Sequence, residues 1–491
     1  MSEMRLRFPP SPTGKIHIGN MRTALFNWLW AKKNNGKLIL RIEDTDQKRS
    51  TKEFEDIIIK ELDWLGIDID EGASVGGEYG PYRQSERLVL YQKYAEKLLK
   101  KGKAYRCYCS EEELEQMRKD ALARGDMPKY NGHCRNLSRE EELKYIEEGR
   151  EPVIRYRLTE EDKDIVVNDE IRGDVTFNTS VLDDFIIFKS DGMPTYNFAV
   201  VIDDALMKIT EVIRGEDHLS NTPKQILIYE ALDFPVPKFA HLPLILDSDR
   251  AKLKKRSEDD DVYIGEYREK GYLPEALFNF LVFLGWSPPD DKEILTRDEI
   301  IKNFELNDIN KSAAVFDIDK LNWVNGKYIR EADLDYIVEL SIPYLKEAGF
   351  IDEVFVEKNY EWLKKVIGVS RTGVDYLSQI PEEAELFFKK LEFEDKKKAV
   401  KEFQEEGVEL VFTNLKKKLI DLDEFKPEKI STVFSELIKE LPVGGRTVYH
   451  PTRLALTGMD SGPEMKNVIY ILGIEETINR LDKALMMRDK K

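Results

Sequence analysis

A chain of 491 residues is too long for one ordinary domain, so we expect roughly three to five domains. Hydrophobic residues make up 41% of it, enough for packed cores, but there is no apolar run of about eighteen residues and no signal-peptide pattern. We therefore expect neither a membrane span nor secretion. Three cysteines argue against a disulfide framework and favour a cytoplasmic protein, and the net charge of −18 disfavours indiscriminate binding to nucleic acid.

The first predicted elements are a strand, a stiff turn and a helix. Residues 4–8 have strand character, the three prolines that follow exclude a helix, and apolar residues recur at helical spacing from Asn20. This order predicts that His17, Gly19 and Asn20 lie at the helix start. An imidazole, a side-chain amide and the positive end of a helix dipole together suit a polyphosphate. Taken alone, His17 is more simply a histidine in a proline-rich loop.

A second strand is predicted for residues 38–42, and acidic residues follow it. Strand, helix and strand indicate a right-handed βαβ unit, the start of a Rossmann-like α/β sheet. Ligands of such sheets bind at the carboxyl ends of strands, where a carboxylate can hold an amine. Glu43 follows the strand directly and is the better candidate, because Asp44 and Asp46 are equally well explained as a helix cap and solvated acids.

All cysteines of the chain, Cys107, Cys109 and Cys134, fall in one short segment. Zinc takes four ligands in a tetrahedral site, so three thiolates leave one position, for which Tyr130 and His133 compete. The alternative is a set of three small buried thiols.

Helices are predicted for residues 51–64 and 83–101, and strands recur within 153–192. This order indicates an α/β insertion between two halves of the first domain. The Rossmann pattern then resumes, with a strand over 209–213 that ends in charged residues and a helix over 222–232. From about residue 265 the pattern becomes mostly helical.

A cationic loop follows a short apolar strand over 242–246. Four of the five residues from 252 to 256 are basic, and acidic residues flank them. In isolation, a solvated charged loop explains this segment as well as a phosphate-binding loop does.

Several motifs resemble those of one family. The run from Pro10 to Asn20 (PSPTGKIHIGN) resembles the HIGH signature of class I aminoacyl-tRNA synthetases, in the form found in the glutamyl and glutaminyl branch. The cationic loop resembles the KMSKS loop in its KLSKR form, with Lys254 in place of the serine. The segments RIEDTD, GPYRQSER, VIRGEDH, FDIDKL and WVNGKYI extend the match over the whole chain, which is similar to bacterial glutamyl-tRNA synthetases.

The resemblance implies an α/β fold, with a Rossmann-like class I synthetase catalytic domain that carries an α/β acceptor-binding insertion. Mostly α-helical stem-contact and anticodon-binding domains follow. The expected limits are 1–82 and 193–230 for the catalytic domain, 83–192 for the insertion with the cysteines, 231–331 for the stem-contact domain with the KMSKS-like loop, and 332–392 and 393–491 for two helical anticodon-binding domains.

The implied reaction makes glutamyl-adenylate from L-glutamate and ATP with Mg²⁺ and then esterifies the 3′ end of tRNA(Glu). Alignment and charge stabilisation are what such a reaction needs. The catalytic residues implied are His17, Asn20, Lys252 and Lys255. The ATP-binding residues implied are Pro10, Thr13, Gly14, His17, Gly19, Asn20, Asp217, Lys252, Lys254, Lys255 and Arg256.

Glutamate carries two carboxylates and one ammonium group, and guanidinium groups suit carboxylates. Arg7 and Arg214, both at predicted strand ends, are the candidates, although Arg7 can instead form a structural ion pair. By resemblance, Glu43 faces the ammonium group. The implied glutamate-binding residues are Arg7, Pro9, Ser11, Glu43, Tyr196, Val200 and Arg214.

Many family members bind zinc through Cys-x-Cys and Cys-x-His, but the last position here is Asn136. A tyrosine-containing variant in the queuosine relatives of the family favours Cys107, Cys109, Tyr130 and Cys134 as ligands of one structural Zn²⁺.

Discriminating members carry an arginine that excludes the anticodons of tRNA(Gln). Alignment with the family gives Gly373 at that position, with Arg371 two residues away. A glycine removes the steric and electrostatic block, so the hypothesis is a non-discriminating, monomeric enzyme that also charges tRNA(Gln) with glutamate.

Two other functions fit part of the sequence. A nucleotidyltransferase that does not use tRNA would have no use for the helical C-terminal third. A non-catalytic RNA-binding relative would fit the loss of His17 or of the loop lysines, and neither is lost.

Overall fold

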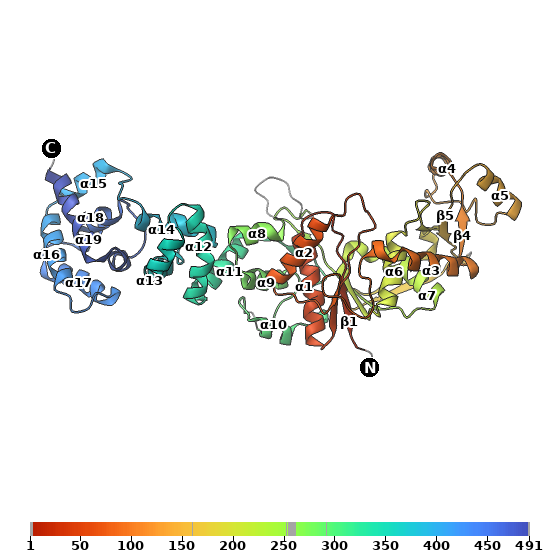
Figure 1. Ribbon diagram of the computed structural model, residues 1–491, viewed down its shortest axis with the longest axis horizontal. Coiled ribbons are helices and arrows are strands. Elements are labelled where there is room, and N and C mark those ends of the chain that lie inside the picture. Colours follow the sequence, from red (N-terminus) through yellow and green to blue (C-terminus); the bar gives the residue numbers. More distant parts are fainter. Residues whose placement is uncertain (1–2, 160, 252, 254–261, 291, 490–491) are drawn as a thin grey trace. The chain divides into compact units, whose positions relative to one another are not determined.

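The computed structural model describes residues 3–489 except 160, 252, 254–261 and 291 (Figure 1). The chain forms two compact units, one of Met1–Glu269 with Pro274–Leu321 and one of Lys270–Leu273 with Asn322–Lys491. No helix in the described part of the chain is long and apolar enough to cross a membrane.

Two sheets of the first unit consist mostly of parallel pairs, as the βαβ pattern predicts, and only β6 and β7 pair antiparallel among their described strands. One sheet has the order β1-β2-β3 and another has β7-β6-β10-β9. Backbone hydrogen bonding from Thr210 to Arg5 brings the start of β9 alongside β1. The strands of these sheets are β1 (Arg5–Phe8), β2 (Lys37–Leu40), β3 (Glu71–Gly72), β6 (Asp164–Asp169), β7 (Gly173–Asn178), β9 (Glu211–Gly215) and β10 (Lys238–Leu242).

A separate antiparallel sheet, with the order β4-β5-β8, belongs to the segment that holds the cysteines. Its strands are β4 (Ala104–Cys107), β5 (Val153–Tyr156) and β8 (Ile186–Phe188). A two-stranded parallel sheet joins β11 (Ile245–Leu246) to β12 (Ala314–Val315).

Helices pack against these sheets because their apolar faces bury there. In α6, residues 198–205 are all buried, and the apolar ones among them share one core with α3, α7 and strands of the three larger sheets. The helices are α1 (Ile18–Lys33), α2 (Lys52–Trp64), α3 (Leu88–Lys100), α4 (Glu111–Ala123), α5 (Arg139–Glu147), α6 (Tyr196–Leu206), α7 (Thr222–Leu232), α8 (Ile264–Lys270), α9 (Pro274–Phe283) and α10 (Arg297–Asn303).

The second unit is helical throughout its described elements, which confirms the prediction for the C-terminal part. Its helices are α12 (Leu334–Glu347), α13 (Glu353–Ser370), α14 (Ile380–Phe388), α15 (Lys396–Phe403), α16 (Val408–Ile420), α17 (Pro427–Glu440), α18 (Gly445–Thr457) and α19 (Met465–Asp489), and α11 (Ile318–Glu331) spans the division between the units.

Some strand pairs join segments that the expected domain limits assign to different domains. Strand β10 lies beyond residue 230 and yet pairs with β9, and the hairpin of β6 and β7 lies inside the expected insertion and yet pairs with β10. The division between the two units at Leu321 falls within the expected stem-contact segment. Pairing between strands that are distant in the chain is a tertiary property, so local patterning does not reveal it.

A buried carboxylate links α6 to the segment that precedes α3. Asp203 is fully buried and accepts hydrogen bonds from Arg87 Nε at 2.6 Å, Gln84 Nε2 at 2.9 Å and the Tyr91 hydroxyl at 2.9 Å. The Arg87 guanidinium is buried as well. Removing one member of such a pair leaves the other charge without compensation in a medium of low dielectric.

We therefore expect Asp203→Asn to lower the free energy of unfolding of the first unit by about 3–5 kcal/mol, because Arg87 loses its counter-ion. Urea denaturation followed by tryptophan fluorescence measures this. Asp46→Asn is the matched control, because Asp46 pairs with Arg49 on the surface, and it should leave the transition unchanged. Equal midpoints for the two variants would contradict the interpretation.

Candidate functional site

A cavity of about 470 Å³ lies at the carboxyl ends of β1 and β9, beside the start of α1. Twelve of the residues predicted from the sequence as catalytic, ATP-binding or glutamate-binding line this cavity. They are Arg7, Pro9, Pro10, Ser11, Thr13, His17, Gly19, Asn20, Glu43, Tyr196, Arg214 and Asp217.

Other selected residues lie elsewhere. Gly14 is not among the residues that line the cavity, and Val200 is 1% exposed in the hydrophobic core around α6. The basic residues Lys252, Lys254, Lys255 and Arg256 lie outside the described residues. Their neighbour Leu253 lines the cavity.

His17 is the N-cap of α1, and its Nδ1 accepts a hydrogen bond from the backbone N–H of Gly19 at 3.1 Å. In the neutral form of the ring the proton is therefore on Nε2, from which it can be donated to an anion. The turn before the helix is held by backbone hydrogen bonds from Glu43 to Pro10 at 3.0 Å and from Thr51 to Pro12 at 3.1 Å. A preorganised helix start of this kind favours phosphate oxygens.

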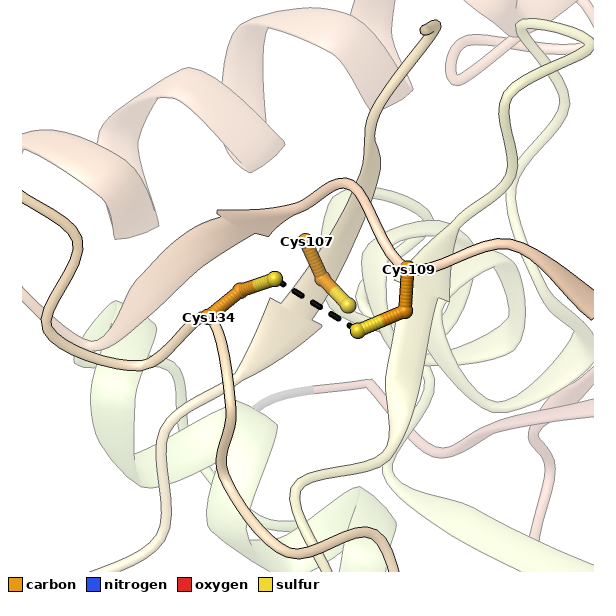
Figure 2. Close-up of side chains that lie close together, drawn as sticks. All are labelled: Cys107, Cys109 and Cys134. Carbon is orange, nitrogen blue, oxygen red and sulfur yellow. Dashed lines mark hydrogen bonds between the residues drawn. The ribbon is translucent and has the colours of Figure 1, made fainter. Parts of the chain in front are cut away.

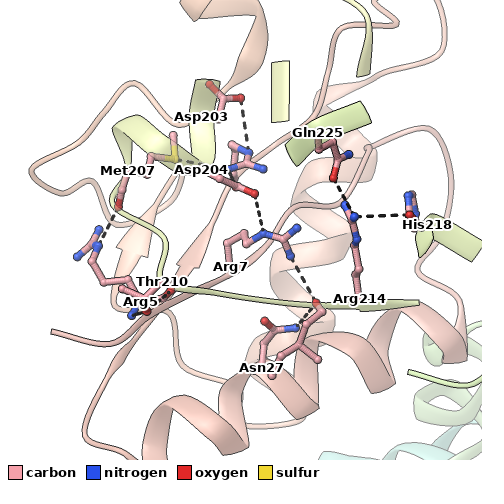
Figure 3. A network of polar contacts seen from close by, with 12 residues as sticks. Arg5, Arg7, Asn27, Asp203, Asp204, Met207, Thr210, Arg214, His218 and Gln225 are labelled. Carbon is pink, nitrogen blue, oxygen red and sulfur yellow. Dashed lines mark hydrogen bonds and ion pairs between the residues drawn. The ribbon is translucent and has the colours of Figure 1, made fainter. Parts of the chain in front are cut away.

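Buried charges contact two of the residues that line the cavity, Arg7 and Glu43, and Figure 3 shows Arg7 with Asp204. Arg41 is fully buried and donates to Asp204 Oδ1 at 2.6 Å and to Glu43 Oε1 at 3.3 Å. Arg7 donates from Nε to Asp204 Oδ2 and from Nη1 to the carbonyl of Ile213, both at 3.4 Å. Burial alone would raise the pKa of Asp204, but the charges of Arg41 and Arg7 bring it below its usual value. Asp204 therefore stays ionised between two arginines.

Glu43 behaves differently from Asp204. Burial raises the pKa of Glu43 to about 7, although the charges of Arg41 and Arg7 oppose the rise. Its carboxyl group therefore exchanges a proton near neutral pH, and a cation bound next to it would favour the carboxylate form.

Arg214 is 5% exposed and is held by neutral acceptors. Its Nε donates to His241 Nε2 at 3.1 Å, and its Nη2 donates to Thr222 Oγ1 at 2.9 Å and to Gln225 Oε1 at 2.8 Å. Nη2 of Arg7 and Nη1 of Arg214 have no hydrogen-bond partner among the described residues. Both side chains line the cavity, so two guanidinium groups can bind an anionic ligand there.

The two acids after Glu43 have structural partners. Asp44 accepts hydrogen bonds from the backbone N–H of Ser85 at 2.8 Å and from its hydroxyl at 2.6 Å, and Asp46 pairs with Arg49. Neither lines the cavity, and the cap of the helix that follows them, α2, is Thr51.

A second cluster brings the three cysteines together (Figure 2). Their sulfur atoms lie within 4.8 Å of one another, and Sγ of Cys109 and Sγ of Cys134 are 3.5 Å apart. In a tetrahedral zinc site with Zn–S bonds of about 2.3 Å, the sulfurs lie roughly 3.8 Å apart. The spacing and the soft donors therefore fit a zinc ion.

Tyr130 is the candidate for the fourth zinc ligand at this cluster. Its hydroxyl oxygen lies 3.4 Å from Cys107 Sγ and 3.9 Å from Cys109 Sγ. The guanidinium of Arg155 lies 3.9 Å from the centre of the tyrosine ring and supports it. His133 is exposed, and its Nε2 lies 3.2 Å from the hydroxyl of Tyr145. The geometry thus favours Tyr130 over His133 as the fourth donor.

In the second unit, Arg371 is the C-cap of α13, and its Nη1 donates to the carbonyls of Ala332 at 2.8 Å and Ile329 at 3.4 Å. A side chain at Gly373 would approach Glu383, because a Cβ built there lies 3.0 Å from Oε2.

Comparison with known proteins identifies the family. The model for tRNA synthetases class I (E and Q), catalytic domain, matches residues 3–323, and the model for an anticodon binding domain matches residues 336–485. The chain is 52% identical over 487 residues to glutamate–tRNA ligase 1 of Thermoanaerobacter sp. (strain X514), with 99% of each covered. The chain belongs to the glutamate–tRNA ligases of class I.

Further relatives agree with this family. The chain is 48% identical over 481 residues to the glutamate–tRNA ligase of Bacillus subtilis, covering 98% of this chain and 99% of that one. A crystal structure of a glutamate tRNA ligase from Elizabethkingia meningosepticum, in complex with its amino acid, superposes with a TM-score of 0.88 at 39% identity and 99% coverage of both chains. These matches confirm the predicted fold class and the predicted class of enzyme.

Class I synthetases use ATP and Mg²⁺, and the start of α1 at this cavity is of a kind that suits phosphate oxygens. Several residues at or next to this site were not predicted from the sequence, namely Arg41, Asp204 and His218. His218 lines the cavity, and its Nδ1 lies 3.1 Å from the hydroxyl of Tyr196. Burial lowers the pKa of His218 to about 4, so its ring is neutral. Arg41 and Asp204 could have been found as charged residues inside the otherwise apolar segments LILRI (38–42) and NFAVVIDDAL (197–206).

Proposed function

We propose that this chain activates L-glutamate with ATP and transfers the glutamyl group to the 3′ end of tRNA(Glu). The charge pattern of the cavity carries the proposal. Arg7 and Arg214 have N–H donors for two carboxylates, and Glu43 offers a carboxylate for one ammonium group. Glutamate carries this set of charges. We expect the enzyme to act as a cytoplasmic monomer.

Activation requires a glutamate carboxylate to attack the α-phosphorus of ATP as pyrophosphate leaves. The N–H groups at the start of α1 and Nε2–H of His17 are suited to bind phosphate oxygens, and the side-chain amide of Asn20 is on the first turn. We assign Lys252 and Lys255, which lie outside the described residues, to the charge on the leaving pyrophosphate. Removing one such contact typically raises the barrier by roughly 3–4 kcal/mol. Mg²⁺, when bound with ATP, neutralises phosphate charge.

Discrimination against glutamine follows from the buried arginines. An amide in place of the side-chain carboxylate presents an N–H₂ group to a guanidinium, so one buried donor loses its acceptor and the charge stays uncompensated. Ser11 and Tyr196 line the same cavity and complete the amino-acid site in this proposal.

Glutamate charging of two purified tRNAs, for glutamate and for glutamine, tests the proposal. We expect charging of both, and pyrophosphate exchange with glutamate only when tRNA is present. Charging of tRNA(Glu) alone would support the enzyme and overturn relaxed specificity. Charging of neither would overturn the proposed function.

The pKa of Glu43 predicts a pH dependence. Protonation removes the charge that attracts the ammonium group, so KM for glutamate should rise about tenfold between pH 8 and pH 6, a range over which glutamate keeps its charges. Aminoacylation at saturating ATP and tRNA measures this. Glu43→Gln should raise KM at every pH and abolish the dependence. A pH dependence that persists in Glu43→Gln would contradict the assignment.

We further propose that the chain charges tRNA(Gln), because Gly373 offers no side chain to exclude it. Introducing a cation should restore selectivity, so Gly373→Arg should raise the ratio of kcat/KM for tRNA(Glu) over tRNA(Gln) by about tenfold or more. Gly373→Gln is the control for side-chain length without charge. A wild-type preference for tRNA(Glu) of about a hundredfold or more would contradict the proposal.

We also propose a structural Zn²⁺ bound by Cys107, Cys109, Tyr130 and Cys134, with no open coordination position. Elemental analysis after dialysis should find about one zinc per chain. Cys134→Ser should remove it and Tyr130→Phe should weaken its binding, while His133→Ala should have no effect. Zinc loss in His133→Ala with retention in Tyr130→Phe would reverse the assignment.

A further inference from the structure

Arg214 differs from Arg7 and Arg41 in the groups that hold it. Arg7 and Arg41 both have Asp204 as a partner. Among the described residues, the hydrogen-bond acceptors of Arg214 are all neutral, namely His241 Nε2, Thr222 Oγ1, Gln225 Oε1 and the carbonyl of His218. The contact with Gln225 is visible in Figure 3. Arg214 is therefore oriented without being neutralised.

The contact with His241 follows from sheet register. Arg214 on β9 and His241 on β10 are direct partners across the parallel pair, so their side chains lie side by side on one face. His241 is fully buried, and its Nδ1 lies 2.6 Å from Oδ2 of Asp169, at the end of β6. Three neighbouring strands thus supply a continuous row of Asp169, His241 and Arg214.

The carboxylate of Asp169 determines which ring nitrogen of His241 carries the proton. Burial by itself would raise the pKa of Asp169, but hydrogen bonds from His241 and from the backbone N–H of Arg172 lower it below its usual value. The backbone N–H groups of Ile171 and His241 donate to it as well. An ionised Asp169 only accepts hydrogen bonds, so Nδ1 of His241 carries the proton.

The other ring nitrogen can then accept. Burial lowers the pKa of His241, against the opposing hydrogen bond to Asp169, so the imidazole is neutral. Nε2 has a lone pair directed at the Nε–H of Arg214. The opposite tautomer would bring two N–H groups against each other, and Arg214 could not keep its position.

We propose that Asp169 and His241 are positioning residues for the amino-acid substrate, through Arg214. Asp169 selects the tautomer of His241, and His241 orients the Arg214 guanidinium while leaving its positive charge for a carboxylate of the substrate. A carboxylate in direct contact with Arg214 would orient it equally well but would compete with the substrate. This inference rests on the proposed function.

The test uses the full chain in glutamate charging of tRNA(Glu). Asp169→Asn presents an amide N–H₂ to Nδ1 and favours the wrong tautomer, and His241→Leu removes the acceptor. Both should raise KM for glutamate by about tenfold or more, with KM for ATP changed by less than about threefold. His241→Gln keeps an acceptor for Arg214 and should restore KM for glutamate to within about threefold of wild type.

Asp184→Asn is the matched control. Asp184 is also buried and accepts hydrogen bonds from Tyr105 at 2.6 Å and from the backbone of Leu158 at 2.9 Å, but it does not line the cavity. It should leave KM for glutamate unchanged. An equal rise in Asp184→Asn would mean that KM reports general loosening, and would overturn the positioning role.

A spectroscopic measurement tests the tautomer without relying on activity. In protein labelled with ¹⁵N-histidine, the five imidazoles give separate signals, and His241 is identified by the signal missing in His241→Gln. We expect the Nδ1–H form in wild type and the Nε2–H form in Asp169→Asn. The Nε2–H form in wild type would overturn the inference even if a variant failed to fold.

The two proposals fail in distinguishable ways. If wild type charges tRNA(Glu) with glutamate but Asp169→Asn and His241→Leu keep the wild-type KM, the positioning role is wrong and the proposed function stands. If wild type charges neither tRNA with glutamate, the proposed function is wrong, and the positioning role fails with it.

Discussion

The first unit depends on compensation of charge at a buried position. Asp204 of α6 lies between Arg41 and Arg7, and all three side chains are at most 3% exposed. Exchanging such ions for apolar side chains often costs little stability, but removing one leaves an uncompensated charge. The arrangement therefore specifies how α6 lies against β1 and β2, and Tyr196 at the start of the same helix reaches the cavity as a result.

The charges that line the cavity explain why it suits an acidic ligand. They belong to three arginines and two carboxyl groups, namely Arg7, Arg22, Arg214, Glu43 and Asp217. Positive charge is in excess, and the pKa of about 7 for Glu43 increases that excess when the group is protonated. A ligand with a net negative charge restores the balance, which is the physical basis for a dicarboxylate amino acid in this site.

Neutral acceptors have a recurring role around this site. Arg22 of α1 is buried and donates to the backbone carbonyls of Leu284 and Pro243, and burial lowers its pKa to about 10. Pro243 lines the cavity, so Arg22 holds the segment after β10 near the helix start. Arg22 and Arg214 both show that a buried guanidinium can be oriented by carbonyls, amides or an imidazole, which leave its charge available.

The sequence by itself determined the features that are local. Proline spacing and apolar periodicity predicted the strand, turn and helix that bring His17 to the N-cap. Arg7, Glu43 and Arg214 were found because each lies at or just after the end of a predicted strand. Tertiary structure alone decided the partners. Arg41 and Asp204 are 163 residues apart, and Asp169 and His241 are 72 apart, so no local pattern connects them. It also decided that Val200 packs in the core. A buried charge requires a partner, and only strand pairing and helix packing determine which residue becomes that partner.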